Sequence, residues 1–396
     1  MFEPSEKLKR LPPYIFSRIS KLKQEAFQKN LDVIDLVMGN PDLPTPAEIV
    51  DQFCETVKNH PRTHRYPQAK GMPKFRKAVC DWYDQRFGVK LNPDKEALAL
   101  VGSKEGVAHL CMAFLNPGDG VLVPNPGYPV YNNGVILAGG EVLDLPLLPE
   151  NNFLPDLGKI PQDMVKKAKM MFFNYPNNPT AAVVDGLDFF KEVAQFGKKN
   201  NIIICHDNAY SEVTFDGYDA PSFLQAPGAK DIGIEFHSCS KSYNMAGWRI
   251  GFVVGNETVI AALEKFKSFL DYGVFTAIQL AAVTALNNSQ KFVKPTVEIY
   301  QRRRDKFVQG LNKLGWPVSL PKATMYLWAP LPPGFEKMGS LEFCEFLLTE
   351  TGVAVTPGIG FGTHGEGYVR MSLVTHDNRF HDALLRIKKF LKTVRA

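Results

Sequence analysis

The sequence lacks any long apolar run. One of its most apolar stretches, 135–148, is interrupted by Glu141 and Asp144 and is far shorter than the ~20 apolar residues that a membrane helix needs. The first residues, MFEPSEKLKRLPPYIF, carry charges and contain no apolar segment followed by a small-residue cleavage site. We therefore expect neither a membrane protein nor an exported one.

An excess of one charge is also missing. Lys and Arg number 46 and Asp and Glu 41, which gives a formal charge of +5 spread along the chain. Nucleic-acid binding usually needs a broad basic patch, and this composition offers none. We interpret the run Arg302-Arg303-Arg304 as a solvated helix face.

Cysteine is scarce and scattered. The six cysteines show no CxxC spacing, which argues against a disulfide framework and against a structural zinc site. We expect reduced thiols in a cytoplasmic protein that carries no metal.

What the sequence does contain is an alternation of short apolar runs with amphipathic stretches over about 92–256. This pattern predicts an α/β fold around a mostly parallel sheet. The seven predicted strands are 97–101, 120–123, 141–145, 170–173, 202–205, 234–237 and 250–254. The predicted helices between them are 104–115, 186–200 and 257–269.

The two ends of the chain form the rest of the prediction. We expect a large domain over 47–290, and a smaller α/β domain formed by 1–46 together with 291–396. The predicted elements of the C-terminal segment are helices 293–314, 341–351 and 378–394 and strands 325–329 and 368–373.

Four motifs follow predicted strands, where open α/β sheets build their sites. GSKEG at 102–106 opens a helix, so its N–H groups and Ser103 can bind a phosphate, although a capped helix start is the simpler reading. NYPNNPT at 174–180 can present Asn177 and Asn178 at the sheet edge, or form a plain turn.

The other two motifs carry charged groups. In NIIICHDNAY, Asp207 follows a fully apolar strand, where a carboxylate needs a cationic partner or serves as a helix cap. In HSCSKSYNMAGWRIGF, Lys241 follows a hydroxyl-rich turn that includes Ser238, and Arg249 lies eight residues further on, at the start of the next strand. These residue types are typical of an enclosed phosphate site.

The order and spacing of GSKEG, NPGYPVY, NYPNNPT, DNAY, SCSK and GWRIG resemble those of class I/II aminotransferases, which are fold type I enzymes that use pyridoxal 5′-phosphate (PLP). The resemblance runs from RLPPYIF to GYVRMSL, over nearly the whole chain. Bacterial alanine (glutamate–pyruvate) aminotransferases look most similar, with LL-diaminopimelate and aspartate aminotransferases as neighbours. One departure is Ala181, where the family's PNNPTG usually has glycine.

This resemblance implies a role for each cofactor residue. Lys241 would form the aldimine with PLP and move the proton, Asp207 would pair with the ring nitrogen, and Tyr210 and Asn178 would bind the ring oxygen. The remaining expected contacts are stacking by Tyr128 and phosphate binding by Ser103, Lys104, Ser238, Arg249 and, from the partner subunit of a homodimer, Tyr66.

The resemblance also implies a substrate site. Arg370 in YVRMS would grip the substrate carboxylate, and Gly39 in MGNPD would let the backbone approach it. Asn178 would contact the substrate as well as the cofactor, and Tyr14 would close over the pocket. No second arginine for a side-chain carboxylate can be identified from the sequence, so the choice of substrate stays open.

We expect an aminotransferase that moves an amino group between an L-amino acid, alanine in the first place, and 2-oxoglutarate or pyruvate. The alternatives are an aspartate or LL-diaminopimelate aminotransferase and, more distantly, a PLP-dependent carbon–sulfur β-lyase, because the same stabilised carbanion can also eliminate a leaving group.

Overall fold

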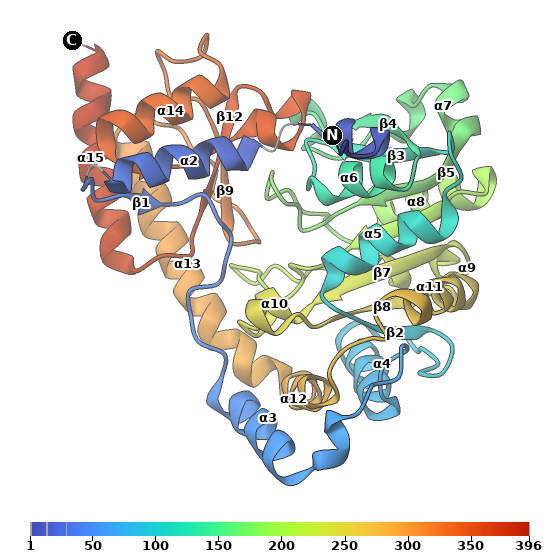
Figure 1. The fold of residues 1–396 in the computed structure, drawn as a ribbon. Coiled ribbons are helices and arrows are strands. Elements are labelled where there is room, and N and C mark those ends of the chain that lie inside the picture. The colour runs from blue at the N-terminus through green and yellow to red at the C-terminus, as the bar shows by residue number, and fades with distance from the viewer. Residues whose placement is uncertain (1, 13–14, 29, 396) are drawn as a thin grey trace.

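A seven-stranded sheet dominates the fold (Figure 1). The computed structural model describes residues 2–12, 15–28 and 30–395. The strands lie in the order β2-β8-β7-β6-β5-β3-β4, and β8 alone runs against its neighbours, since it pairs antiparallel with both β2 and β7. Their bounds are β2 Ala97–Leu100, β3 Gly120–Asn125, β4 Glu141–Pro146, β5 Ala168–Phe173, β6 Ile203–Asp207, β7 Gly233–Ser238 and β8 Gly251–Gly255. The predicted α/β fold with a mostly parallel sheet is confirmed.

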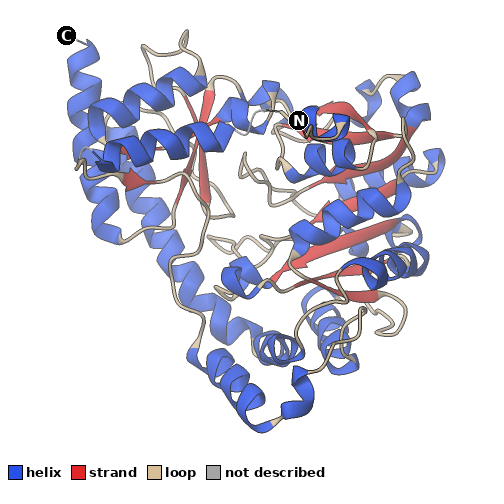
Figure 2. Cartoon of the chain, viewed as in Figure 1, coloured by secondary structure: helices blue, strands red, loops and turns tan. Residues whose placement is uncertain are grey.

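Helices cover both faces of this sheet because its strands are apolar on both sides (Figure 2). One face packs against α5 Ser103–Phe114, α6 Val130–Leu137 and α11 Glu257–Leu270. The other packs against α4 Pro73–Phe87, α8 Asp188–Asn200 and α12 Thr276–Asn287. Helix α3, Ala47–Asn59, contacts α12. The sheet is thereby buried on both faces, and its edges are left to form sites.

A second group of elements lies beside the sheet and has its own hydrophobic cluster. It contains the antiparallel sheet β11-β12-β9, with bounds β9 Tyr326–Pro330, β11 Thr356–Pro357 and β12 Tyr368–Ser372. Strand β1, Ile34–Asp35, pairs in parallel with β10, Val353–Ala354. The helices of this group are α2 Ile15–Gln28, α13 Ser289–Lys313, α14 Ser340–Thr351 and α15 Asp377–Arg395. The domain boundaries at 47 and 290 stay a prediction.

Four shorter helices complete the chain. They are α1 Glu6–Lys9, α7 Gln162–Lys167, α9 Ala229–Ile232 and α10 Cys239–Ser242. None of the helices in the described ranges is both long enough and apolar enough to cross a membrane.

The arginine run on α13 corrects one expectation. Arg302 is half-exposed, but the Arg303 and Arg304 side chains are 4% and 1% exposed. Arg303 donates to both carboxylate oxygens of Asp42, at 2.9 and 2.8 Å, and Arg304 to both of Asp216, at 2.7 and 3.0 Å. The reading of the run as a solvated face is therefore wrong for two residues, because acidic partners from distant segments allow their burial.

A buried carboxylate on β7 contacts a histidine of the neighbouring strand β6. Glu235 on β7 is fully buried and accepts hydrogen bonds from the Tyr83 hydroxyl at 2.9 Å and the Asn208 amide at 3.0 Å. His206 and His237 lie 2.8 and 3.1 Å from its oxygens. Burial opposes its charge, but His206 and His237 hold the pKa of Glu235 well below its usual value.

Candidate active site

The predicted site residues converge on one cavity of about 330 Å³ at the carboxyl end of the parallel strands. Strand β8 contributes from its start, because an antiparallel strand begins at the edge where its neighbours end. Of the thirteen residues predicted, eleven line this cavity: Gly39, Ser103, Lys104, Tyr128, Asn178, Asp207, Tyr210, Ser238, Lys241, Arg249 and Arg370.

Two predicted residues are not in the cavity lining. Tyr66 is 89% exposed, and its ring centroid lies 5.7 Å from that of the exposed Tyr272. Tyr14 lies outside the described residues.

Lys241 lies in the short helix α10, which starts at the end of β7. The Ser238 hydroxyl caps this helix by accepting from the Ser240 N–H at 3.2 Å. The Lys241 ammonium donates to the Gly39 carbonyl at 2.6 Å. Burial lowers the pKa of Lys241, and the positive charges of Arg370 and Arg249 add to the effect, while Tyr326 opposes it. The amine is thereby closer to the neutral form that a nucleophile or a base needs.

Asp207 ends strand β6 with one oxygen satisfied and one left over. The Tyr131 hydroxyl donates to Oδ2 at 2.8 Å, whereas Oδ1 is buried without a hydrogen-bond partner among the described residues. Burial raises the pKa of the Asp207 carboxyl. A buried carboxylate with an unused oxygen that faces a cavity is suited to a cationic ligand such as a protonated ring nitrogen.

The start of α5 and the turn before β8 form an anion-binding corner. Ser103 and Lys104 begin α5, and Arg249 lies beside them, since a Cβ at position 102 would lie 2.4 Å from an Arg249 terminal nitrogen. Gly102 has a φ of +80°, which L side chains rarely adopt. Hydroxyl groups from Ser238 and Ser240 line the same cavity. Helix N–H groups, hydroxyls and a guanidinium together fit a phosphate.

Arg370 on β12 enters the cavity from the other group of elements. It donates to Asn178 Oδ1 at 2.7 Å and to the Val37 carbonyl at 2.9 Å. Its guanidinium carbon lies 4.1 Å from the ring centroid of Tyr326 and 4.7 Å from that of Phe361. Contacts on several sides hold this guanidinium in one orientation, as planar carboxylate recognition requires.

The loop after β5 separates its two central asparagines. Asn178 faces the cavity, but Asn177 accepts from the Thr180 N–H and hydroxyl and donates to the Asn174 carbonyl. Asn177 therefore stabilises the loop and presents no amide to the cavity. Ala181 has a φ of +58°, so this turn keeps the left-handed conformation that the usual glycine adopts.

Among the site residues that sequence reasoning missed, three contact the predicted ones directly. Tyr326 and Phe361 line the cavity, and Tyr131 supports Asp207 from behind, with its ring stacked on Phe172 at 5.1 Å. Tyr131 lies in the NPGYPVY motif itself, which was the available signal. Tyr326 lies in a strand that is buried on both faces, so the sequence did not indicate which of its residues would face the cavity.

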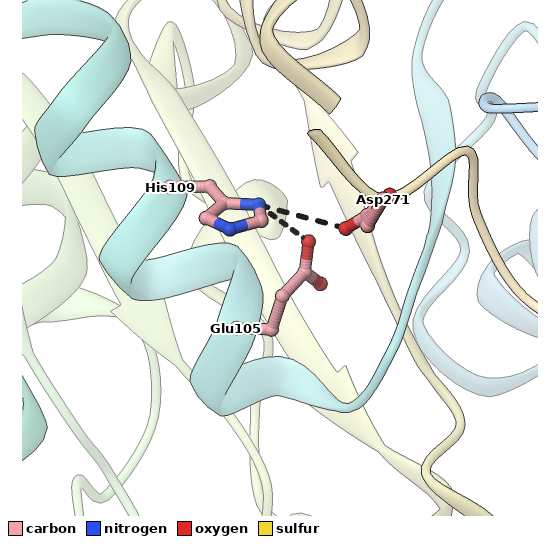
Figure 3. A group of neighbouring side chains, drawn as sticks. All are labelled: Glu105, His109 and Asp271. Carbon is pink, nitrogen blue, oxygen red and sulfur yellow. Dashed lines mark ion pairs between the residues drawn. The ribbon is translucent and has the colours of Figure 1, made fainter. Parts of the chain in front are cut away.

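A separate cluster could be mistaken for a metal centre. Glu105, His109 and Asp271 bring three potential ligand atoms together (Figure 3). However, the fully buried Lys267 ammonium donates to Glu105 Oε1 at 2.6 Å and to Asp271 Oδ2 at 2.8 Å. This cluster already contains a cation, and it ties α5 to the C-terminal end of α11.

The chain matches known proteins over almost its full length. Residues 31–386 match the family model described as aminotransferase class I and II. A protein of Dehalococcoides mccartyi named LL-diaminopimelate aminotransferase is 53% identical over 98% of both chains. A Moorella thermoacetica protein of the same name is 50% identical over 99% of both. These names match the alternative stated from the sequence better than they match the alanine reading.

Solved structures agree with this assignment. Apo-BacF from Bacillus subtilis is 39% identical, with a TM-score of 0.94 over 98% of both chains. A probable N-succinyldiaminopimelate aminotransferase from Thermus thermophilus is 36% identical, with a TM-score of 0.88 over 95% of this chain and 99% of that one. Together with a cavity that fits a phosphate, a protonated ring nitrogen and a reactive lysine, these matches show that the chain belongs to the class I and II aminotransferases and is a PLP-dependent enzyme of that family.

Proposed function

We propose that this enzyme is an LL-diaminopimelate aminotransferase, which exchanges an amino group between LL-diaminopimelate and a 2-oxo acid such as 2-oxoglutarate. The observation that carries the proposal is the 53% identity, over 98% of both chains, to a protein of that name. Alanine was the first expectation, and its basis was a set of short motifs. Full-length identity weighs more because substrate choice depends on the whole pocket.

We assign the cavity residues as follows. Bound PLP supplies an electron sink for the bond that breaks at the amino-acid Cα. Asp207 keeps the ring nitrogen protonated, and Lys241, with its lowered pKa, moves the proton at Cα. Tyr210 and Asn178 would hold the ring oxygen, and Tyr128 would stack on the ring.

The remaining contacts divide between phosphate and substrate. Ser103, Lys104, Ser238 and Arg249 bind the phosphate, and Arg370 binds the α-carboxylate of the substrate. Gly39 would let the backbone approach the same carboxylate, and we still expect Tyr14 to close over the pocket.

The distal end of the substrate needs another partner. Lysine and arginine side chains line the described cavity at four positions, namely Lys104, Lys241, Arg249 and Arg370. Two of these belong to the phosphate corner and one is the reactive amine, so Arg370 is left to bind a single carboxylate. We propose that the distal amino-carboxylate group contacts a second subunit.

Exposed side chains support this homodimer. Tyr66, Phe269, Leu270 and Tyr272 are 89%, 82%, 58% and 58% exposed and lie near one another in space or in sequence, and grouped exposed apolar side chains mark protein–protein contact sites. Tyr66 would then reach the phosphate corner of the partner. All six cysteines are free thiols and five are buried, which supports a reducing, cytoplasmic location.

The visible absorption spectrum of the PLP-loaded enzyme tests the substrate. We expect LL-diaminopimelate to bleach the absorption band of bound PLP at the lowest concentration, and 2-oxoglutarate to restore it. L-Alanine, L-aspartate and L-glutamate serve as competing donors. Faster bleaching by L-alanine would restore the alanine reading. Release of pyruvate and ammonia from a β-substituted amino acid without an oxo-acid acceptor would favour the β-lyase.

A further inference from the structure

Tyr326 contacts both halves of the proposed site. It begins β9, is 3% exposed, and lines the cavity. Its hydroxyl lies 3.1 Å from the Tyr210 hydroxyl, and its ring lies under the Arg370 guanidinium at 4.1 Å. One side chain therefore connects the tyrosine assigned to the cofactor with the arginine assigned to the substrate.

The same hydroxyl also reaches the segment that contacts the reactive lysine. A Cβ at position 39 would lie 1.9 Å from the Tyr326 oxygen, so only glycine leaves room for it. The carbonyl of Gly39 accepts from the Lys241 ammonium at 2.6 Å. Tyr326 thus fills the space between Gly39 and Tyr210, next to Lys241.

The role assigned to Tyr210 determines which tyrosine donates. Either hydroxyl could be the donor in the 3.1 Å contact between Tyr326 and Tyr210. A tyrosine hydroxyl has a single proton, so a Tyr210 hydroxyl that donates to the ring oxygen of PLP has only its oxygen left for Tyr326. With the cofactor bound, Tyr326 is therefore the donor and the Tyr210 oxygen the acceptor. The proton of Tyr210 is then free to point into the cavity, and the donated bond polarises it further.

We propose that Tyr326 is a positioning residue of the transamination site: its hydroxyl orients the Tyr210 hydroxyl toward the ring oxygen of PLP, and its ring seats the Arg370 guanidinium. This inference rests on the proposed function of the cavity. The Tyr326 side chain then has two distinct effects: its hydroxyl acts on Tyr210 beside the cofactor, and its ring acts on Arg370 beside the substrate.

Tyr326→Phe removes the hydroxyl and keeps the ring. A hydrogen bond given to the ring oxygen of PLP lowers the basicity of the nitrogen beside it, so weakening that bond raises the midpoint of the pH titration of the visible band. In the PLP-loaded protein we expect a rise of about 0.5 pH unit or more, with the KM for LL-diaminopimelate changed less than about threefold. Tyr326→Leu, which also removes the ring, should raise this KM about tenfold or more.

Tyr300→Phe is the matched control. Tyr300 belongs to the same buried cluster, and its hydroxyl has no hydrogen-bond partner among the described residues. The pH titration midpoint of the visible band in the Tyr300→Phe variant should stay within about 0.2 pH unit of the wild-type value. The inference is overturned if Tyr326→Phe titrates like wild type, or if Tyr300→Phe shifts by the same amount.

The same measurements keep this inference separate from the proposed function. If LL-diaminopimelate bleaches the visible band of the wild-type enzyme but the titration midpoint of Tyr326→Phe is unchanged, only the role of Tyr326 is refuted. A wild-type enzyme that does not respond to LL-diaminopimelate removes the proposed substrate, whatever Tyr326→Phe does to the pH titration.

Discussion

Replacement of Arg370 gives the most direct test of the substrate site. A guanidinium has five N–H groups. One is donated to Asn178 and one to the Val37 carbonyl, while Nε has no partner among the described residues. Three N–H groups are left, and a carboxylate needs two of them for a bidentate contact.

The expected loss follows from those two contacts. A hydrogen bond to a charged group contributes about 1.5–3 kcal/mol, so losing both costs about 3–6 kcal/mol in a buried cavity. At about 1.4 kcal/mol per factor of ten, Arg370→Gln should lower kcat/KM about 100- to 20,000-fold for the amino acid and for the oxo acid. Arg370→Lys keeps the charge and should lose about 10- to 100-fold.

The assay compares bleaching rates at low substrate with the binding constant for PLP. Arg370 faces the substrate side, so both variants should bind PLP within about threefold of wild type. Arg302→Gln is the control, because Arg302 is half-exposed on α13 and is not among the residues lining the cavity. A loss below tenfold in Arg370→Gln, or a parallel loss of PLP binding, would refute the reasoning.

Three further predictions follow from the charged groups. Lys241→Ala should abolish turnover while the folded protein still binds PLP non-covalently, and near-normal turnover would contradict the assignment. Arg303→Met should lower the free energy of unfolding in urea by about 2–3 kcal/mol, and Arg302→Met by under about 0.5 kcal/mol. Only the loss of Arg303 leaves the poorly exposed Asp42 unpaired. Glu235→Gln should lower the free energy of unfolding most above about pH 4.5. Below that pH the difference between wild type and variant should shrink, because a group with a depressed pKa stabilises the folded protein only while it is ionised.

Local patterns predicted much of the sheet and the cofactor side of the site. Strand β7 was expected at 234–237 and spans Gly233–Ser238, because a short apolar run between turn residues is sufficient to define a buried strand. Asp207 ends such a strand, and Lys241 lies in the short helix that follows another, so predicting the strands also placed both residues at the edge of the sheet. Helix α4 was not predicted, although its buried residues Phe75, Val79 and Tyr83 recur every four positions, which is the spacing of an amphipathic helix.

Long-range contacts account for what was missed. Arg303 is buried because Asp42, 261 residues away, lies opposite it. Tyr326 faces the cavity because β9 packs beside residues 209–215, the segment that follows strand β6 of the seven-stranded sheet. Neither contact leaves a signal in the local sequence, because a charged or aromatic residue has the same neighbours in the chain whether it is exposed or buried.

The cavity is assembled from three distant stretches: the Met38–Gly39 peptide, the strand ends between Ser103 and Arg249, and the pair Tyr326 and Arg370. A ligand that touches all three binds only when all three are folded together. Mass action then makes PLP a stabiliser of the whole chain, by an amount that grows with the logarithm of its free concentration. A shortage of cofactor would therefore lower the amount of folded protein as well as the fraction that is active.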